Sequence, residues 1–275
     1  MFDRRIKLLK HILEKRGKLD IKTSDLIYNV FGPASRYKAR PFLRTIGDVE
    51  GEFRPVYFYG HSEPLYIPAH IDPGFIYQVT CELFRPQEWH YYEIPQTKVE
   101  PHDYVLDAGA AEGLFTFLIA NRCTRVYTVE PLPSFVSSLK KTFERQTNVE
   151  VMPYALGSEI GKASLHGDGI TTEVQVDERG EIAVTTVDEL IIKQNRPLSY
   201  IKADLEGYER SMLAGAKESI IKYKPKIAIT TYHKRDDHLF IMDFLNSLDL
   251  GYTFICCGVE ERWGQPVMLH AWVSE

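Results

Sequence analysis

The sequence lacks any apolar run long enough to cross a membrane, and it has few cysteines. A membrane-spanning helix needs about 18 or more apolar residues in succession, and no stretch reaches that length. The four cysteines include the adjacent pair Cys256 and Cys257, which is not a zinc-binding spacing. The basic first residues are not followed by the apolar core of a signal peptide. These absences predict a protein of a reducing, cytoplasmic compartment without a membrane span.

The distribution of charge is uneven along the chain. The net charge is −5, yet residues 1–40 hold 11 Lys and Arg against 4 Asp and Glu, which leaves −12 for the remainder. Binding of nucleic acid normally requires a basic face. Because the acidic remainder carries the predicted site, we expect no nucleic acid partner. The basic residues 1–40 could contact an acidic partner or membrane surface, although a solvent-exposed face of a helix accounts for the same excess of Lys and Arg.

Residues 1–100 are expected to form a helical and aromatic-rich extension. Two helices are predicted, an amphipathic one ending near Gly17 and a short one over residues 24–31 with Ser24 as its cap. The apolar face of the first consists of Phe2, Ile6, Leu9 and Leu13. Residues 33–100 are rich in aromatics and broken by prolines, which favours short strands and turns. This region could form a cap over a site, or mediate assembly into a homo-oligomer.

From residue 101 to 275 the apolar pattern alternates between strands and helices, which predicts an α/β domain with a doubly wound sheet. The predicted strands cover 104–107, 125–130, 149–153, 199–204, 226–231, 252–257 and 267–273. The predicted helices cover 113–121, 134–145, 208–223 and 237–248, with a short one capped by Asp188. A polar turn between the last two strands favours an antiparallel final pair. Three short strands over 163–187, with a turn at Gly167–Gly169, predict a hairpin insertion.

The domain is organised around a strand, a glycine-containing turn and a helix. The strand ends at Asp107, and glycines in the following turn let the backbone approach a ligand at the helix N-terminus. The next strand ends at Glu130, close to the offset at which a carboxylate holds ribose hydroxyls. A dinucleotide fingerprint would need glycine where this turn, counted from Gly109, has Ala111 and Leu114. The turn suits S-adenosylmethionine (AdoMet) better, because AdoMet carries no phosphate.

Polar residues that suit catalysis follow two later strands. Asp204 and Glu206 follow one predicted strand and His233 follows the next, at the edge where ligands of open α/β sheets bind. His233 has a suitable pKa for a general base that removes the proton of a hydroxyl acceptor. Structural roles account for these residues almost as well as catalysis does. Asp204 could form an ion pair or cap the following helix, and His233 could be a hydrogen-bonded residue at the end of a strand. With Asp236 and Asp237 these acids could instead hold Mg²⁺, although their spacing matches no known metal motif.

Four stretches resemble the FkbM family of class I AdoMet-dependent methyltransferases: VLDAGAAEGLFT, VYTVEP, YIKADLEGYERSMLAGA and KPKIAITTYHKRDD. The resemblance implies a Rossmann-like fold with seven strands and an AdoMet site. It places Asp107, Gly109, Glu112 and Gly113 near the methionine end, Glu130 at the ribose and Ala155 near the adenine. Ala110 and Asp204 complete the expected cofactor-binding residues.

These observations together predict an O-methyltransferase. The expected acceptor is a small molecule with a hydroxyl group, such as a saccharide or natural product, and His233, Asp204 and Glu206 are the candidate catalytic residues. Two alternatives stay open. The chain could be an AdoMet-binding scaffold without activity, or an oxidoreductase that uses a nicotinamide cofactor.

Overall fold

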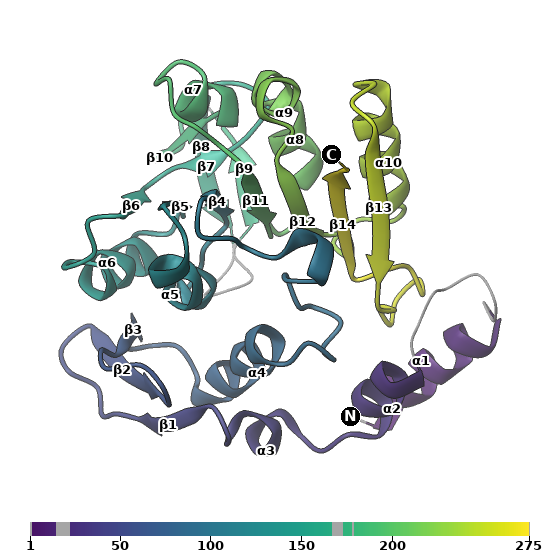
Figure 1. The fold of residues 1–275 in the computed structure, drawn as a ribbon. Helices are drawn as coiled ribbons and strands as arrows, with labels where there is room; N and C mark the ends of the chain where they lie inside the picture. Colours follow the sequence, from purple (N-terminus) through teal and green to yellow (C-terminus); the bar gives the residue numbers. More distant parts are fainter. Residues whose placement is uncertain (1, 15–22, 167–172, 178, 275) are drawn as a thin grey trace.

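A computed structural model describes residues 2–14, 23–166, 173–177 and 179–274 of the chain. The turn predicted at Gly167–Gly169 lies outside these residues. The described part is a mixed α/β fold in which a central sheet stands above an N-terminal layer of helices and a small sheet (Figure 1).

Seven strands form the central sheet. They are β4 Tyr104–Ala108, β5 Arg125–Val129, β6 Val149–Met152, β11 Tyr200–Ala203, β12 Lys226–Thr230, β13 Tyr252–Cys257 and β14 Met268–Val273. Their order is β13–β14–β12–β11–β4–β5–β6. The strands from β12 to β6 are parallel, and β14 runs antiparallel to both β12 and β13. The doubly wound sheet with an antiparallel last strand is therefore confirmed.

Helices cover both faces of this sheet, which explains why its central strands are almost wholly apolar. These helices are α5 Leu114–Ile119, α6 Pro133–Thr142, α7 Val187–Ile191, α8 Glu209–Ala214, α9 Lys217–Tyr223 and α10 Asp237–Ser247. Successive strand residues face opposite sides. Leu106 packs in one cluster with Met212 and Ile241, whereas Val105 packs in another with Phe115.

A second, four-stranded sheet accounts for the predicted insertion. It consists of β7 Ala155–Leu156, β8 Gly161–His166, β9 Glu173–Val176 and β10 Ile182–Thr185, in the order β7–β10–β8–β9. The strand β8 pairs antiparallel with both β9 and β10. The β8–β9 hairpin confirms the predicted antiparallel insertion.

The N-terminal layer lies below the carboxyl ends of the parallel strands (Figure 1). It comprises α1 Phe2–Glu14, α2 Thr23–Phe31, α3 Ser35–Ala39, β1 Leu43–Ile46, β2 Phe53–Phe58, β3 Leu65–Pro68 and α4 Pro73–Phe84. The short 3-10 helix η1 Pro95–Thr97 lies instead against the central sheet, where Thr97 Oγ1 is 2.8 Å from Nδ1 of His270 on β14. Phe58, Ile67 and Ile76 of this layer share one hydrophobic cluster with Leu114 and Phe135 of the α/β part. The two parts therefore share a core, and the domain division at residue 100 stays a prediction.

The prediction of short strands and turns throughout residues 33–100 is wrong for residues 35–39, which form the short helix α3, and for residues 73–84, which form helix α4. The Asp72 side chain caps this helix by accepting the Gly74 N–H at 2.6 Å, and Pro73 occupies its first turn. Ile76 and Val79 are buried at helical spacing. The surrounding prolines and aromatics concealed this periodicity in the sequence.

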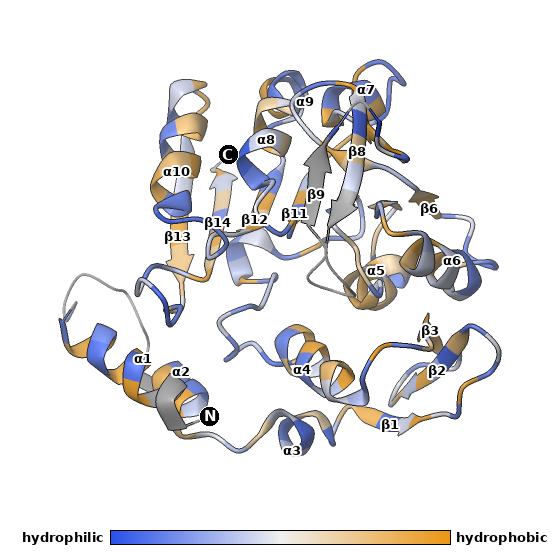
Figure 2. Ribbon diagram, turned by 180° about the vertical axis from the view of Figure 1, so that it is seen from behind, coloured by the Kyte–Doolittle hydropathy of each residue, from blue (hydrophilic) through white to orange (hydrophobic). Residues whose placement is uncertain are grey.

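The predicted apolar face of α1 is also wrong in part. Leu8 is buried, whereas Ile6 and Leu13 are 52% and 68% exposed. Figure 2 shows the apolar and polar residues mixed along this helix. Helix α2 begins at Thr23, so Ser24 lies inside it and is not its cap. No helix in the described part of the chain is both long and apolar enough to cross a membrane.

In the region 186–223, the structure differs from the prediction in two features of its helices. The single helix expected there is divided into α8 and α9 at Gly215, where an added Cβ would lie 2.1 Å from the Gly157 carbonyl oxygen. Thr186, and not Asp188, caps α7 by accepting the Glu189 N–H. Asp188 instead accepts a hydrogen bond from the Ser219 N–H at 2.7 Å.

Candidate active site

A cavity of about 450 Å³ opens at the carboxyl ends of β4, β5 and β11. The loops after these strands line one side of it, and α4 with the segment that follows lines the other. This volume lies in the range of about 300–1,000 Å³ typical of small-molecule sites. The predicted residues on its wall are Gly109, Ala110, Glu112, Glu130, Ala155, Asp204 and Glu206. Asp107, Gly113 and His233 are not on the wall.

The turn after β4 needs its two glycines for packing. Both Gly109 and Gly113 have positive φ angles, 73° and 82°. A Cβ on Gly109 would lie 1.9 Å from the Asp204 carbonyl oxygen, and one on Gly113 would lie 2.2 Å from a methyl carbon of Leu139. Gly109 thereby lets this turn approach the Asp204 segment closely. Gly113 instead seats α5 against α6.

Asp107 is fully buried beneath this turn and does not reach the cavity directly. One carboxylate oxygen lies 3.0 Å from Nζ of Lys202, and the other accepts a hydrogen bond from Thr116 Oγ1 at 2.7 Å. Lys202 also donates to the Gly109 carbonyl oxygen at 2.5 Å and lines the cavity. The pair therefore fixes the turn from below. Lys202 stands in the stretch YIKADLEGYERSMLAGA, but the sequence analysis gave it no role, because its partner Asp107 lies 95 residues earlier in the chain.

Glu130 is buried on the cavity wall, and two backbone amides hold its carboxylate. Oε2 accepts the Ala111 N–H at 2.8 Å, and Oε1 accepts the Leu132 N–H at 2.9 Å. Burial raises the pKa of Glu130 to about 7, although these hydrogen bonds work in the opposite direction. Burial likewise raises the pKa of Glu112 to about 7. Two carboxyl groups on one wall suit a ligand that carries hydroxyls and a positive charge.

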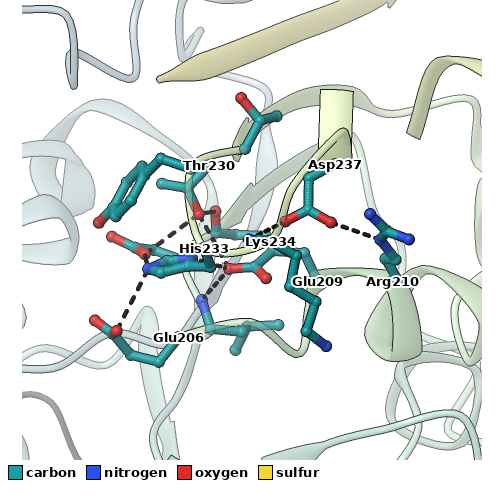
Figure 3. Close-up of polar contacts among 12 residues, drawn as sticks. Glu206, Glu209, Arg210, Thr230, His233, Lys234 and Asp237 are labelled. Atoms are coloured by element: carbon teal, nitrogen blue, oxygen red, sulfur yellow. Dashed lines mark hydrogen bonds and ion pairs between the residues drawn. The ribbon is translucent and has the colours of Figure 1, made fainter. Parts of the chain in front are cut away.

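The three predicted catalytic residues lie together. Nε2 of His233 is 3.8 Å from Asp204 Oδ1 and 3.4 Å from Glu206 Oε2 (Figure 3). Nδ1 of the same ring is 2.7 Å from Glu209 Oε1. Burial lowers the pKa of His233, but the carboxylates of Glu206 and Glu209 outweigh this effect and raise it to about 10. Since both ring nitrogens face carboxylates and not the cavity, His233 is poorly placed as a general base.

The aspartates after His233 do not join this cluster. Asp237 is buried, forms an ion pair with Arg210 at 2.5 Å and accepts the Lys234 N–H at 2.8 Å (Figure 3). The Asp236 side chain is 62% exposed. The suggested participation of Asp236 and Asp237 in one metal site with Asp204 and Glu206 is therefore wrong.

The segment after α4 supplies polar aromatic side chains that sequence analysis missed. Tyr92 donates its hydroxyl to Asp204 Oδ2 at 2.8 Å, and Nε2 of His90 lies 3.5 Å from the same oxygen. His90 also contacts the Tyr232 hydroxyl at 3.3 Å. All three line the cavity. The distance of more than 100 residues between His90 and Asp204 left no local pattern to detect.

Comparison of structures places the fold among methyltransferases. The FkbM methyltransferase from Methylobacillus flagellatus is similar with a TM-score of 0.50 and 20% identity, covering 90% of this chain and 60% of that chain. The chain thus spans less than two thirds of that relative's length. Fibrillarin from Aeropyrum pernix, solved with natively bound S-adenosyl-L-methionine, has a TM-score of 0.43 and 11% identity, covering 84% of this chain and 99% of that chain.

Sequence comparison gives the family. No curated protein matches the chain. The family model of the methyltransferase FkbM domain matches residues 107–254, which is more than half of the chain. The match includes the turn after β4, Glu130 and the cluster of Asp204, Glu206 and His233. The chain belongs to the FkbM methyltransferase family.

Proposed function

We propose that the protein is an AdoMet-dependent methyltransferase that methylates a hydroxyl group on a small polar acceptor, such as a saccharide or natural product. The observation that carries this proposal is the cavity at the strand ends, where the glycine-containing turn and buried Glu130 face an acidic cluster. Membership of the family supports methyl transfer.

The described residues fit the cofactor. AdoMet supplies a methyl group on a positively charged sulfur. The fixed carboxylate of Glu130 accepts the ribose hydroxyls, and Gly109, Ala110 and Glu112 surround the methionine end. Ala155, with Tyr154 and Leu156, forms the wall for the adenine. Asp107 and Gly113 act indirectly, because they hold the turn in place.

The acceptor binds on the side of α4. His90, Tyr92 and Tyr232 offer hydrogen bonds and ring faces to a polyhydroxyl molecule, and Asp204 and Glu206 point to its reacting hydroxyl. Methyl transfer needs the oxygen, carbon and sulfur in line, so positioning of the acceptor supplies much of the rate. His233 then acts by orienting and charging this cluster. It does not take the proton itself.

Calorimetry with AdoMet and its demethylated product tests the cofactor assignment. We expect binding to the full chain that weakens in Glu130→Gln, whereas Glu144→Gln, an exposed residue away from the cavity, should bind like the wild type. An absence of binding by both ligands would reject the proposal. Isotope-labelled AdoMet with a panel of hydroxyl compounds, followed by mass spectrometry, then identifies the acceptor.

The two alternatives give different results in the same experiments. An inactive scaffold would bind AdoMet without labelling any acceptor. A nicotinamide-dependent oxidoreductase would bind NADH, which a fluorescence titration detects. The Ala111 methyl group on the cavity wall disfavours a pyrophosphate there.

A further inference from the structure

Three side chains at the edge of the cavity place donor atoms around one point. Asp204, Glu206 and His233 each offer one ligand atom, and these atoms all lie within 4.8 Å of one another. Divalent ions with bonds of about 2.1 Å hold neighbouring donors about 3 Å apart. The distances of 3.4 Å and 3.8 Å from His233 Nε2 to the two carboxylates exceed that value only slightly. The Glu206 side chain is 43% exposed and can adjust, whereas the distance between His233 and Asp204 requires a small shift of one of those two side chains.

The histidine in this group is held as metal-binding histidines are. Its side chain is only 8% exposed, and its buried Nε2 makes no hydrogen bond although it points at both carboxylates (Figure 3). The opposite nitrogen, Nδ1, is 2.7 Å from Glu209 Oε1. Glu209 is itself fixed by the Leu205 N–H and by Thr230 Oγ1. The carboxylate on Nδ1 holds that nitrogen as the donor, so a metal ion that replaces the proton on Nε2 would have this second nitrogen as its ligand.

Asp204 is also oriented from outside the group. Tyr92 donates to its Oδ2 at 2.8 Å, which leaves Oδ1 on the side of His233. The two less exposed donors therefore each have a supporting residue, Glu209 for His233 and Tyr92 for Asp204. A purely structural ion pair between His233 and Glu209 would not require the ring's second nitrogen to face two further carboxylates.

We propose that Asp204, Glu206 and His233 bind one divalent transition-metal ion, with Mn²⁺ preferred to Mg²⁺. The imidazole donor favours a transition metal, because Mg²⁺ prefers oxygen ligands and gives up its water molecules reluctantly. The binding itself does not depend on the proposed methyl transfer.

The use of the ion in catalysis rests on the proposed function. When bound, the ion would supply a Lewis acid that lowers the pKa of the acceptor's hydroxyl, and the proton would pass to water at the exposed side of Glu206. The oxygen then forms a bond to the methyl carbon while the carbon–sulfur bond breaks. The electron pair of that bond stays on sulfur, which becomes a neutral thioether. His233 serves as a ligand in this scheme, which explains why its Nε2 faces the carboxylates.

Titration of the full chain with Mn²⁺, followed by the electron paramagnetic resonance signal of the free ion, tests the proposal. We expect one Mn²⁺ per chain and competition by Mg²⁺ only at higher concentration. Glu206→Gln and His233→Gln should each weaken Mn²⁺ binding by about tenfold or more. Asp236→Asn removes one exposed charge near His233 without touching the group, so it should bind like the wild type. Circular dichroism verifies that each variant is folded.

Two results would overturn the proposal: no stoichiometric binding of Mn²⁺, or equal affinity in Glu206→Gln and Asp236→Asn. Because Glu206 is partly exposed, its replacement leaves the fold intact even if His233→Gln does not. Calorimetry with AdoMet separates the two proposals. Binding of AdoMet with no Mn²⁺ site rejects only the metal. Binding of Mn²⁺ with no AdoMet site rejects only the proposed function and leaves the metal site supported.

Discussion

At the scale of single residues, the buried pair of Asp107 and Lys202 holds the turn after β4 in position. Lys202→Ala leaves the Asp107 carboxylate buried without its charge partner, at 0% exposure. Removal of one partner of a buried pair costs about 3–5 kcal/mol, so we expect the free energy of unfolding in urea to fall by that amount. Lys222→Ala, on the exposed side of α9, is the control. Recovery of stability in Lys202→Met with Asp107→Asn would identify the unpaired charge as the cause.

Glu130 gives the site a dependence on pH. Ribose hydroxyls bind best to the ionised carboxylate, and burial raises the pKa of Glu130 to about 7. AdoMet affinity should therefore rise with pH, by up to about tenfold between pH 6 and pH 8, as each pKa unit corresponds to about 1.4 kcal/mol. The comparison is with Glu130→Gln, which should lose this part of the dependence. An identical pH profile in both proteins would exclude Glu130 as the titrating group.

The raised pKa of Glu130 affects stability in the opposite direction: as the pH rises, its contribution to the free energy of unfolding falls. A carboxyl group whose pKa is raised in the folded state binds its proton more tightly there than in the unfolded chain. The contribution of Glu130 to the free energy of unfolding is thus largest at low pH and declines as the pH rises from about 4.5 to about 7. Glu130→Gln should reduce this decline in urea unfolding curves recorded at pH 5 and pH 8.

At the scale of elements, the break between α8 and α9 depends on the contact of Gly215 with the β7–β8 connection. In Gly215→Ala the new methyl group would lie 2.1 Å from the Gly157 carbonyl oxygen, so the helices must move. We expect a loss of about 1–3 kcal/mol in unfolding free energy, as for other overpacked sites. Gly161→Ala meets nothing within 4 Å and should stay within about 0.5 kcal/mol of the wild type. Equal stability of the two variants would contradict the packing argument.

Substitutions on helix α4 should change the KM for the acceptor and leave the affinity for AdoMet unchanged. Gln78 lines the cavity from this helix and donates to Glu82 at 3.0 Å. Gln78→Ala is expected to raise the acceptor KM about 2- to 10-fold, from the ~0.5–1.5 kcal/mol of one hydrogen bond, with AdoMet affinity unchanged. Gln87→Ala, which lies off the cavity wall, is the matched control. Weakened AdoMet binding in Gln78→Ala alone would place the cofactor on this side.

The elements that sequence analysis located well are those with local signals. Apolar runs that end in Asp107, Glu130 and Asp204 identify parallel strands, because both faces of such strands are buried. Helix α4 was missed because its capping aspartate and first proline stand among many other turn residues. Lys202 lies in a quoted motif, but its pairing with Asp107 arises only through the tertiary fold, as does the approach of His90 to Asp204. No short window of sequence contains either contact.

At the scale of the whole molecule, the shared core makes the N-terminal layer part of the folding unit. Removal of residues 1–100 would expose a set of core residues on the α/β part: Leu114, Phe117, Phe135, Leu139 and Phe143. Among the hydrophobic clusters of the described residues, removal of residues 1–33 disrupts the small one that contains Trp89 and Val259. We expect the shorter truncation to fold and the longer one to aggregate, as measured by circular dichroism and gel filtration. A folded chain lacking residues 1–100 would establish residues 101–275 as an independent domain.

Light scattering on the same proteins tests the expected homo-oligomer. If the N-terminal helices mediate assembly, the truncation of residues 1–33 should have the mass of one chain, and the full chain should have a mass of two or more chains. The same number of chains per particle in both proteins would show that α1 and α2 have no role in assembly.

Two different stretches of chain line the cavity. Under the proposed function, the turn after β4 and the strand ends hold the methyl donor, whereas α4 and the segment through Tyr92 contact the molecule that is modified. Exchange of residues 73–92 between relatives could therefore redirect the enzyme to new compounds, provided that Tyr92 and its bond to Asp204 are kept. Helix α4 and the loop that follows it are therefore the segment to exchange when the selectivity for the acceptor is to be changed.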